Sequence, residues 1–306
     1  MRLCWVAIWT ASSCVMYVAC STVMVLANKS LASSLDVRAP VALLLMQNCV
    51  ATALVVCCKQ AGLVRYDGFD GATALKWLPV NACFVLMLLT SFIAMRFLSV
   101  PMITVFKQLA NLLTVGGELY FFGKSVSKGV VLSLATMIVG ACLATNNDVD
   151  FSLAGYCWQG ANCVATSAYV LYLKHATKTI PLSKFGMVFY NNFLSLLLLL
   201  FISVAAGELS EIKAAHDRGS LSAYFFAFNA FAGAVGFFLN FASVWCISAT
   251  SATTYAVVGA LNKIPVTVLG VLLFDATVSR EMAKYIALSF AGGFMYSYEK
   301  LREMRR

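Results

Sequence analysis

The run Gly259–Pro265 places an amide, an ammonium group and a proline within two helical turns of an otherwise apolar stretch. Pro265 cannot donate a backbone hydrogen bond to the carbonyl of Leu261, so a helix through this run is expected to kink. A buried lysine without an anion tends to lose its proton, whereas Lys263 facing a phosphate would keep its charge. The run therefore predicts a polar patch in which Lys263 binds an anionic substrate.

Phe189-Tyr190-Asn191-Asn192 is a second polar motif in apolar surroundings. The two adjacent amides offer paired donors and acceptors that suit the edge of a nucleobase, and either aromatic ring could stack on such a ligand. Adjacent residues on a helix point about 100° apart, so both amides can border one site only in a groove between helices. The same amides could instead join helices by hydrogen bonds, and the residue types leave both interpretations open.

Lys107 and Glu118 lie within a further apolar stretch, residues 97–123. An ionisable side chain inside a membrane span costs on the order of a few kcal/mol and usually faces a cavity or a partner. The two residues are three turns apart and share a helix face, but about 16 Å along the axis separates them, which excludes direct pairing. Each could be an internal or snorkelling charge or could serve the function, and the sequence leaves the choice open.

The elements that carry these residues are predicted to be membrane helices. Of the 306 residues, 61% are hydrophobic and only 11% are charged, whereas about a quarter of the residues in a soluble domain are charged. A bilayer core about 30 Å thick requires about 20 apolar residues in a helix. Stretches of that order predict ten spans in an all-α membrane protein: 3–28, 39–58, 77–95, 97–123, 129–147, 151–173, 185–207, 219–247, a span ending at 274, and 282–298. The small polar residues 248–254 are expected to separate the eighth span from the ninth.

The distribution of loop charges predicts the orientation. An even number of spans places both termini on one side, and the loop and tail Lys and Arg residues concentrate there, which predicts cytosolic termini. This asymmetry accounts for the net charge of +9 and argues against a nucleic-acid surface. The first stretch is longer than the apolar part of a signal peptide, so it is expected to remain as a span. The sequon at Asn28 lies so close to a helix end that it is expected to be unmodified.

The chain also contains a weak internal repeat. A shift of 152 residues aligns Phe122–Ser127 with Phe274–Ser279 and Gly140 with Gly292. Five helices per repeat would give the second copy the opposite orientation, and inverted repeats are typical of secondary transporters. We therefore expect a single transmembrane domain with repeats at about 3–147 and 151–298, followed by a basic cytosolic tail at 299–306. A channel or a scaffold is the alternative use of a duplicated bundle.

Catalytic and metal-binding motifs are absent from the sequence. The eleven cysteines lie mostly in apolar runs without metal-ligand spacing and are expected to be free thiols. Gly123-Lys124-Ser125 is similar to the end of a phosphate-binding loop, but Glu118 occupies the position of the loop's first glycine. The sequence therefore predicts no enzymatic activity, no metal and no cofactor.

At the two polar motifs the chain resembles the nucleotide-sugar transporters of the drug/metabolite transporter superfamily, and specifically the Golgi GDP-mannose transporters. Phe189–Asn192 matches the guanine-recognition motif of that family, and Gly259–Pro265 matches its GALNK motif. The resemblance also includes Asn28-Lys29 and Thr253-Thr254-Tyr255, and it covers essentially the whole chain.

The resemblance implies a site with two ends. Asn191 and Asn192 would hold guanine beside Phe189 and Tyr190, whereas the sugar and phosphate end would be lined by Tyr255, Gly259, Asn262 and Lys263. Tyr17 on the first helix and Ser243 on the eighth would add polar contacts. Asn240 stands where the family has a serine near the base, which puts base contacts and selectivity in question.

The resemblance further implies exchange of GDP-mannose for GMP across the Golgi membrane, among membrane lipids and without nucleic acid. Broader transport of GDP-fucose or GDP-arabinose is the alternative within this class. A membrane scaffold that keeps the fold without transport is the alternative from another class, and a homodimer is left open.

Overall fold

A computed structural model describes residues 2–33, 39–123, 126–219, 221–250 and 252–304. Every regular element in these ranges is a helix. The helices are α1 (Arg2–Ser33), α2 (Pro40–Gln60), α3 (Gly71–Phe97), α4 (Val100–Phe122), α5 (Lys128–Asn146), α6 (Leu153–Thr179), α7 (Lys184–Ala205), α8 (Glu208–Asp217), α9 (Ala223–Ala249), α10 (Ala252–Leu261), α11 (Lys263–Leu273) and α12 (Arg280–Met304). The all-α expectation is thus confirmed for the described residues.

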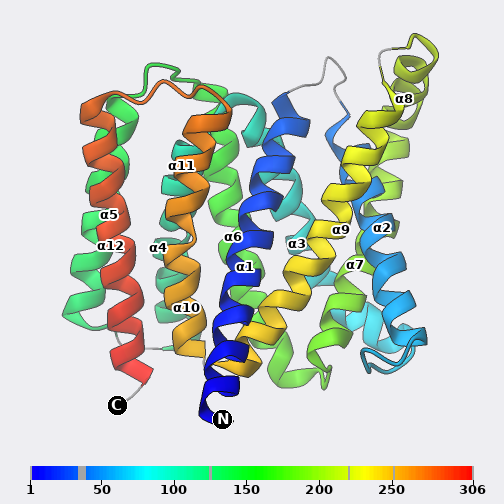
Figure 1. The fold of residues 1–306 in the computed structure, drawn as a ribbon, viewed down its shortest axis with the longest axis horizontal. Helices are drawn as coiled ribbons and strands as arrows, with labels where there is room; N and C mark the ends of the chain where they lie inside the picture. The colour runs from blue at the N-terminus through cyan, green and yellow to red at the C-terminus, as the bar shows by residue number, and fades with distance from the viewer. Residues whose placement is uncertain (1, 34–38, 124–125, 220, 251, 305–306) are drawn as a thin grey trace.

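The long helices run side by side in one bundle (Figure 1). Helix α1 begins and helix α12 ends at the same end of this bundle, which we call the terminal end; the opposite end is the far end. Within the described ranges, six helices are long and apolar enough to cross a membrane: α1, α2, α3, α5, α7 and α9. The bundle is therefore a multi-pass membrane protein, while ten spans and the side of the termini stay predictions.

Serine residues begin several of the helices. The side chains of Ser127, Ser152, Ser183 and Ser222 each accept a hydrogen bond from the backbone N–H three residues later, at the starts of α5, α6, α7 and α9. This arrangement satisfies one of the backbone donors that a helix start leaves without a partner. These serines therefore fix where four of the helices start.

The eighth and ninth predicted spans are separated where the sequence predicts. α9 ends at Ala249 and α10 begins at Ala252, inside the predicted break 248–254. A second interruption lies at Asn262, between α10 and α11. Pro265 has no N–H to donate to the carbonyl of Leu261. The interruption follows Leu261 directly, as the predicted kink requires.

Helix α8 was not predicted, because residues 208–220 read as a polar connection. Its first residue, Glu208, is buried and accepts a hydrogen bond from the N–H of Ala42 at 2.9 Å, at the start of α2. Ile212 and Ala215 pack in a small apolar cluster with Leu221. The segment thus forms a short helix that binds the far end of the bundle. At the other end, α12 continues to Met304, so most of the expected tail is helical.

The contacts between the two halves of the chain come in matching pairs. α1 packs on α9 as α6 packs on α3, and α2 packs on α9 as α7 packs on α3. α5 packs along α12. In that pair a Cβ added to Gly140 would lie 2.6 Å from the backbone nitrogen of Ser289, and one added to Gly292 would lie 2.8 Å from that of Met137. The two contacts are related by the same shift of 152 residues, since 140 + 152 = 292 and 137 + 152 = 289.

Candidate functional site

A cavity of about 430 Å³ lies between the helices, within the size range of small-molecule sites. Its walls come from α1, α2, α3, α4, α6, α7 and α9. The lining residues are Ser21, Met24, Val25, Asn28, Leu44, Gln47, Asn48, Ala51, Phe84, Met87, Leu88, Ser91, Phe92, Met95, Lys107, Asn162, Thr166, Asn192, Gly233, Gly236, Leu239 and Asn240.

The cavity occupies the middle and the far half of the bundle. α1 starts at the terminal end (Figure 1) and contributes residues 21–28 from its second half. α2 runs in the opposite direction and contributes residues 44–51 from its first half, and α3 contributes residues 84–95 from its second half. The cavity is therefore displaced away from the terminal end.

Lys107 is the only cation among the lining residues that the structure describes, and no carboxylate is among them. Several amides share the wall. Gln47 donates hydrogen bonds to Asn28 at 3.1 Å and to Asn229 at 2.9 Å. Asn162 donates to the carbonyl of Met87 at 2.8 Å and to Thr90 at 3.1 Å. A positively charged, amide-rich cavity without acidic groups favours an anionic ligand with polar edges.

The paired amides on α7 have different surroundings. Asn192 lines the cavity, and its buried amide nitrogen has no hydrogen-bond partner among the described residues. Asn191 instead accepts a hydrogen bond from the indole of Trp77 at 2.8 Å and donates one to the hydroxyl of Tyr169 at 3.1 Å. In this conformation one amide is available to a ligand, whereas its neighbour joins α7 to α3 and α6.

The two aromatic residues of the same motif lie outside the cavity lining. Phe189 stacks on Tyr66 with ring centroids 4.8 Å apart. The hydroxyl of Tyr190 accepts a hydrogen bond from the N–H of Asp70 at 2.8 Å. Both aromatic side chains therefore pack toward the start of α3 instead of facing the cavity.

Asn262, at the interruption between α10 and α11, is hydrogen-bonded to a residue of the cavity wall. The amide of Asn262 donates to the hydroxyl of Ser21 at 2.6 Å, and Ser21 lines the cavity. Thr22 donates to the carbonyl oxygen of the same amide at 3.0 Å. Lys263 and Lys107 lie on two packed helices, α11 and α4, one turn from Thr267 and Thr104, whose hydroxyl oxygens are 2.9 Å apart. The structure thus brings the Lys263 charge, predicted from the sequence, near a lysine whose role the sequence left open.

The remaining predicted residues lie at the cavity or toward the terminal end. Asn240 lines the cavity, whereas the Ser243 hydroxyl donates to the carbonyl of Leu239 at 2.8 Å on its own helix. The rings of Tyr17 and Tyr255 are 4.8 Å apart between α1 and α10. A Cβ on Gly259 would lie 3.6 Å from the Tyr17 hydroxyl, in ordinary contact. Thr253 and Thr254 have side chains outside the described residues.

The sequence missed the amides of Gln47, Asn48 and Asn162 as wall residues. Gln47 and Asn48 are adjacent amides inside an apolar span, as Asn191 and Asn192 are, and Asn162 is an amide in another span. Single amides are also common where helices pack, so only the geometry shows which of them reach the cavity.

A helical membrane bundle whose halves pack as matched pairs around a cationic cavity has the architecture of a membrane transporter. The comparisons with known proteins agree. The family model of the Triose-phosphate Transporter family matches residues 8–297. The chain belongs to this family, and within it to the group of GDP-mannose transporters.

Two relatives show the extent of the match. The chain is 32% identical over 303 residues to a GDP-mannose transporter of Aspergillus oryzae, which covers 94% of this chain and 79% of the relative. It is 34% identical over 294 residues to the GDP-mannose transporter GONST1 of Arabidopsis thaliana, with 94% and 88% covered. The fold also matches a solved structure described as "Crystal structure of protein", with a TM-score of 0.55 and 15% identity over 96% of this chain and 98% of that one.

Proposed function

We propose that this protein is an antiporter that carries GDP-mannose from the cytosol into the Golgi lumen and returns GMP. The observation that carries the proposal is the cavity itself, which combines Lys107, the amide of Asn192 without a protein partner, and a lining without carboxylates. The named relatives are GDP-mannose transporters, which supports the same substrate here.

In this proposal guanine binds at the α7 end of the cavity. The Asn192 amide nitrogen can donate to a carbonyl oxygen of the base, which satisfies a group that is otherwise buried without a partner. Asn191 contributes by fixing α7 against α3 and α6 through Trp77 and Tyr169. It contacts the base directly only if those hydrogen bonds exchange when the ligand binds.

The diphosphate binds between Lys107 and Lys263. An anion between the two side chains is attracted to both ammonium groups, so its binding favours their charged form. The sugar end then extends toward the α10–α11 interruption, where Asn262 and Tyr255 lie. GMP shares the base and a phosphate with GDP-mannose, so one site can accept both in turn.

The matched packing of the two halves supports transport by alternating exposure of this one site. In the proposed topology the chain has ten spans in two inverted repeats, and both termini lie in the cytosol. The same geometry fits GDP-fucose and GDP-arabinose, because the described contacts concern the nucleotide and not the sugar. Direct competition among the three GDP-sugars tests this choice.

Uptake into proteoliposomes tests the proposal. Labelled GDP-mannose should accumulate in vesicles preloaded with GMP but not in empty or UMP-loaded vesicles. Asn192→Ala and Lys263→Ala should abolish this uptake, whereas Asn146→Ala and Lys284→Ala, which change exposed residues, should leave it unchanged. A folded protein that shows neither uptake nor thermal stabilisation by GMP would instead be a scaffold.

A further inference from the structure

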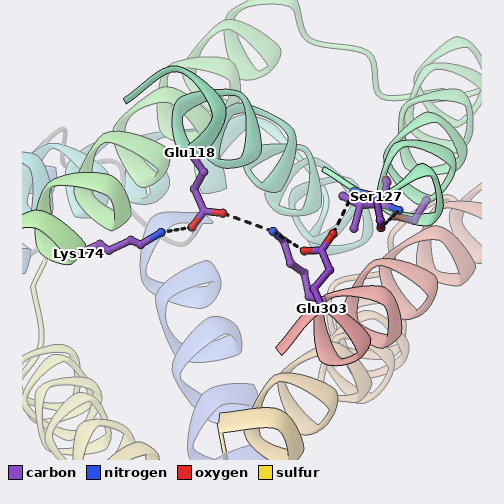
Figure 2. Close-up of polar contacts among 7 residues, drawn as sticks. Glu118, Ser127, Lys174 and Glu303 are labelled. Atoms are coloured by element: carbon purple, nitrogen blue, oxygen red, sulfur yellow. Dashed lines mark hydrogen bonds and ion pairs between the residues drawn. The ribbon is translucent and has the colours of Figure 1, made fainter. Parts of the chain in front are cut away.

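A network of ion pairs joins four helices at the terminal end (Figure 2). Its centre is Glu118 on α4. One carboxylate oxygen accepts from Lys174 of α6 at 2.5 Å, and the other accepts from Lys300 of α12 at 3.4 Å. Lys300 also pairs with Glu303 at 3.3 Å, and Glu303 accepts the N–H of Ser127 at the start of α5. We call these residues, Glu118, Lys174, Lys300, Glu303 and Ser127, the terminal network.

The terminal network connects the first half of the chain to the second. Glu118 and Ser127 precede the middle of the sequence, whereas Lys174, Lys300 and Glu303 follow it. The Glu118 side chain is only 15% exposed, so its charge is less screened by water than that of a surface pair. The two lysines therefore hold α6 and α12 against α4 through a single carboxylate.

This connection lies at the end of the bundle away from the cavity. Between the network's end and the cavity, α1 is also in contact with the second half. The rings of Tyr17 and Tyr255 are 4.8 Å apart, and the sulfur atoms of Cys14 and Cys246 are 3.6 Å apart. The halves are also in contact at the far end, where the hydroxyls of Thr104 and Thr267 are 2.9 Å apart, but the ion pairs between the halves among the described residues lie at the terminal end.

The equivalent position at the far end carries no charge. The shift of 152 residues relates Glu118 to Gly270 on α11, since 118 + 152 = 270. A Cβ added to Gly270 would lie 2.5 Å from the Cβ of Val100, so this position packs tightly against the start of α4. Two exchanging conformations of an inverted repeat would have equal free energy if both ends were identical, and a charged contact at one end removes that equality.

We propose that the terminal network is a latch that stabilises the conformation closed at the terminal end. Opening that end requires Glu118 to leave Lys174 and Lys300, so the latch lowers the population of the opposite conformation. Its breakage and reformation would set how often the empty transporter presents its site to each side. The latch rests on the proposed transport by alternating exposure, but it does not depend on which substrate is carried.

A distance measurement across the terminal end tests the latch. Spin labels at Thr177 of α6 and Tyr298 of α12, both exposed, would report the separation of these helices in a background without native cysteines. In Glu118→Gln the population with the short distance should fall on the order of threefold to tenfold, the scale of a partly buried charge pair. Glu281→Gln removes the carboxylate of an exposed pair at the far end of α12 and should leave the distances unchanged.

Lys300→Gln provides a second variant in case Glu118→Gln fails to fold, because it leaves the Lys174 pair in place. A separate measurement uses protein that keeps its native cysteines. In both latch variants, oxidative crosslinking of Cys14 to Cys246 should be slower than in the wild type. Unchanged distances and crosslinking in folded variants would overturn the latch and leave a static support. Loss of GDP-mannose uptake with the latch populations intact would instead contradict only the proposed substrate.

Discussion

The indole N–H of Trp77 donates a hydrogen bond to the side-chain carbonyl of Asn191 at 2.8 Å, and the two residues are buried in the bundle. This contact separates the roles of two neighbouring amides that look alike in the sequence. Asn191 holds helices together, whereas the Asn192 amide at the cavity keeps a donor that has no partner in the described part of the chain.

Asn191→Ala should therefore destabilise the empty protein. The substitution leaves the buried Trp77 N–H without an acceptor, at a cost of about 1–3 kcal/mol. Asn192→Ala removes no described hydrogen bond and should change the unfolding temperature little, but it should remove the stabilisation by GMP. Thermal unfolding of both variants in detergent, with and without GMP, measures the difference. Equal loss of stability in the two variants would contradict this division of roles.

Lys107→Met should weaken GMP binding tenfold or more while leaving the empty protein at least as stable as the wild type. The reason is that the substitution removes an attraction for phosphate and replaces an ionisable side chain inside an apolar span by an apolar one. Isothermal titration with GMP and a melting curve of the empty protein test the two parts separately. Lys284→Met, at an exposed pair on α12, serves as the matched control.

Gly140→Ala and Gly292→Ala should each destabilise the protein by about 1–3 kcal/mol, because the added methyl groups meet the backbone of the facing helix at 2.6 Å and 2.8 Å. Gly160→Ala on α6 has open space around its Cβ and should be neutral or slightly stabilising. Melting temperatures of the three variants check the expectation. A small effect at Gly140 together with a large one at Gly292 would show that the two contacts are not equivalent.

Glu208 should make stability depend on pH. Burial raises the pKa of this carboxyl, although the hydrogen bonds from the N–H groups of Ala42 and Val41 oppose the change. Because the folded state then binds the proton more tightly than the unfolded state, stability falls as the pH rises from about 4.5 through the folded-state pKa. Melting curves between about pH 4 and pH 8 should show a smaller decline for Glu208→Gln than for the wild type. Parallel curves would exclude Glu208 as the source.

Much of the bundle could be predicted from apolar length and from the positions of small and helix-breaking residues. The break after Ala249 and the interruption at Asn262 follow from such local signals. The docking of helix α8 does not, because Glu208 accepts a hydrogen bond from the start of α2, a contact between residues distant in the sequence.

The candidate site was predictable only by residue type. The sequence identifies Lys263, Asn191 and Asn192 as polar groups in apolar helices, but side-chain direction depends on the neighbouring helices. Lys107 joins the cavity wall because α4 turns that face inward, whereas Glu118, three turns further along, meets Lys174 and Lys300. The spacing within α4 predicts neither the cavity position of Lys107 nor the ion pairs of Glu118.

The reciprocal glycine contacts make the α5–α12 seam an isologous interface inside a single chain, of the kind that two identical subunits share across a two-fold axis. Identical subunits must place the same residue at both ends of such an axis. The fused chain is free of that constraint: it keeps glycine on both sides of the seam, at Gly140 and Gly292, yet has Glu118 at one end and Gly270 at the other. Joining two related halves in one polypeptide therefore allows a symmetric seam together with different side chains at its two ends.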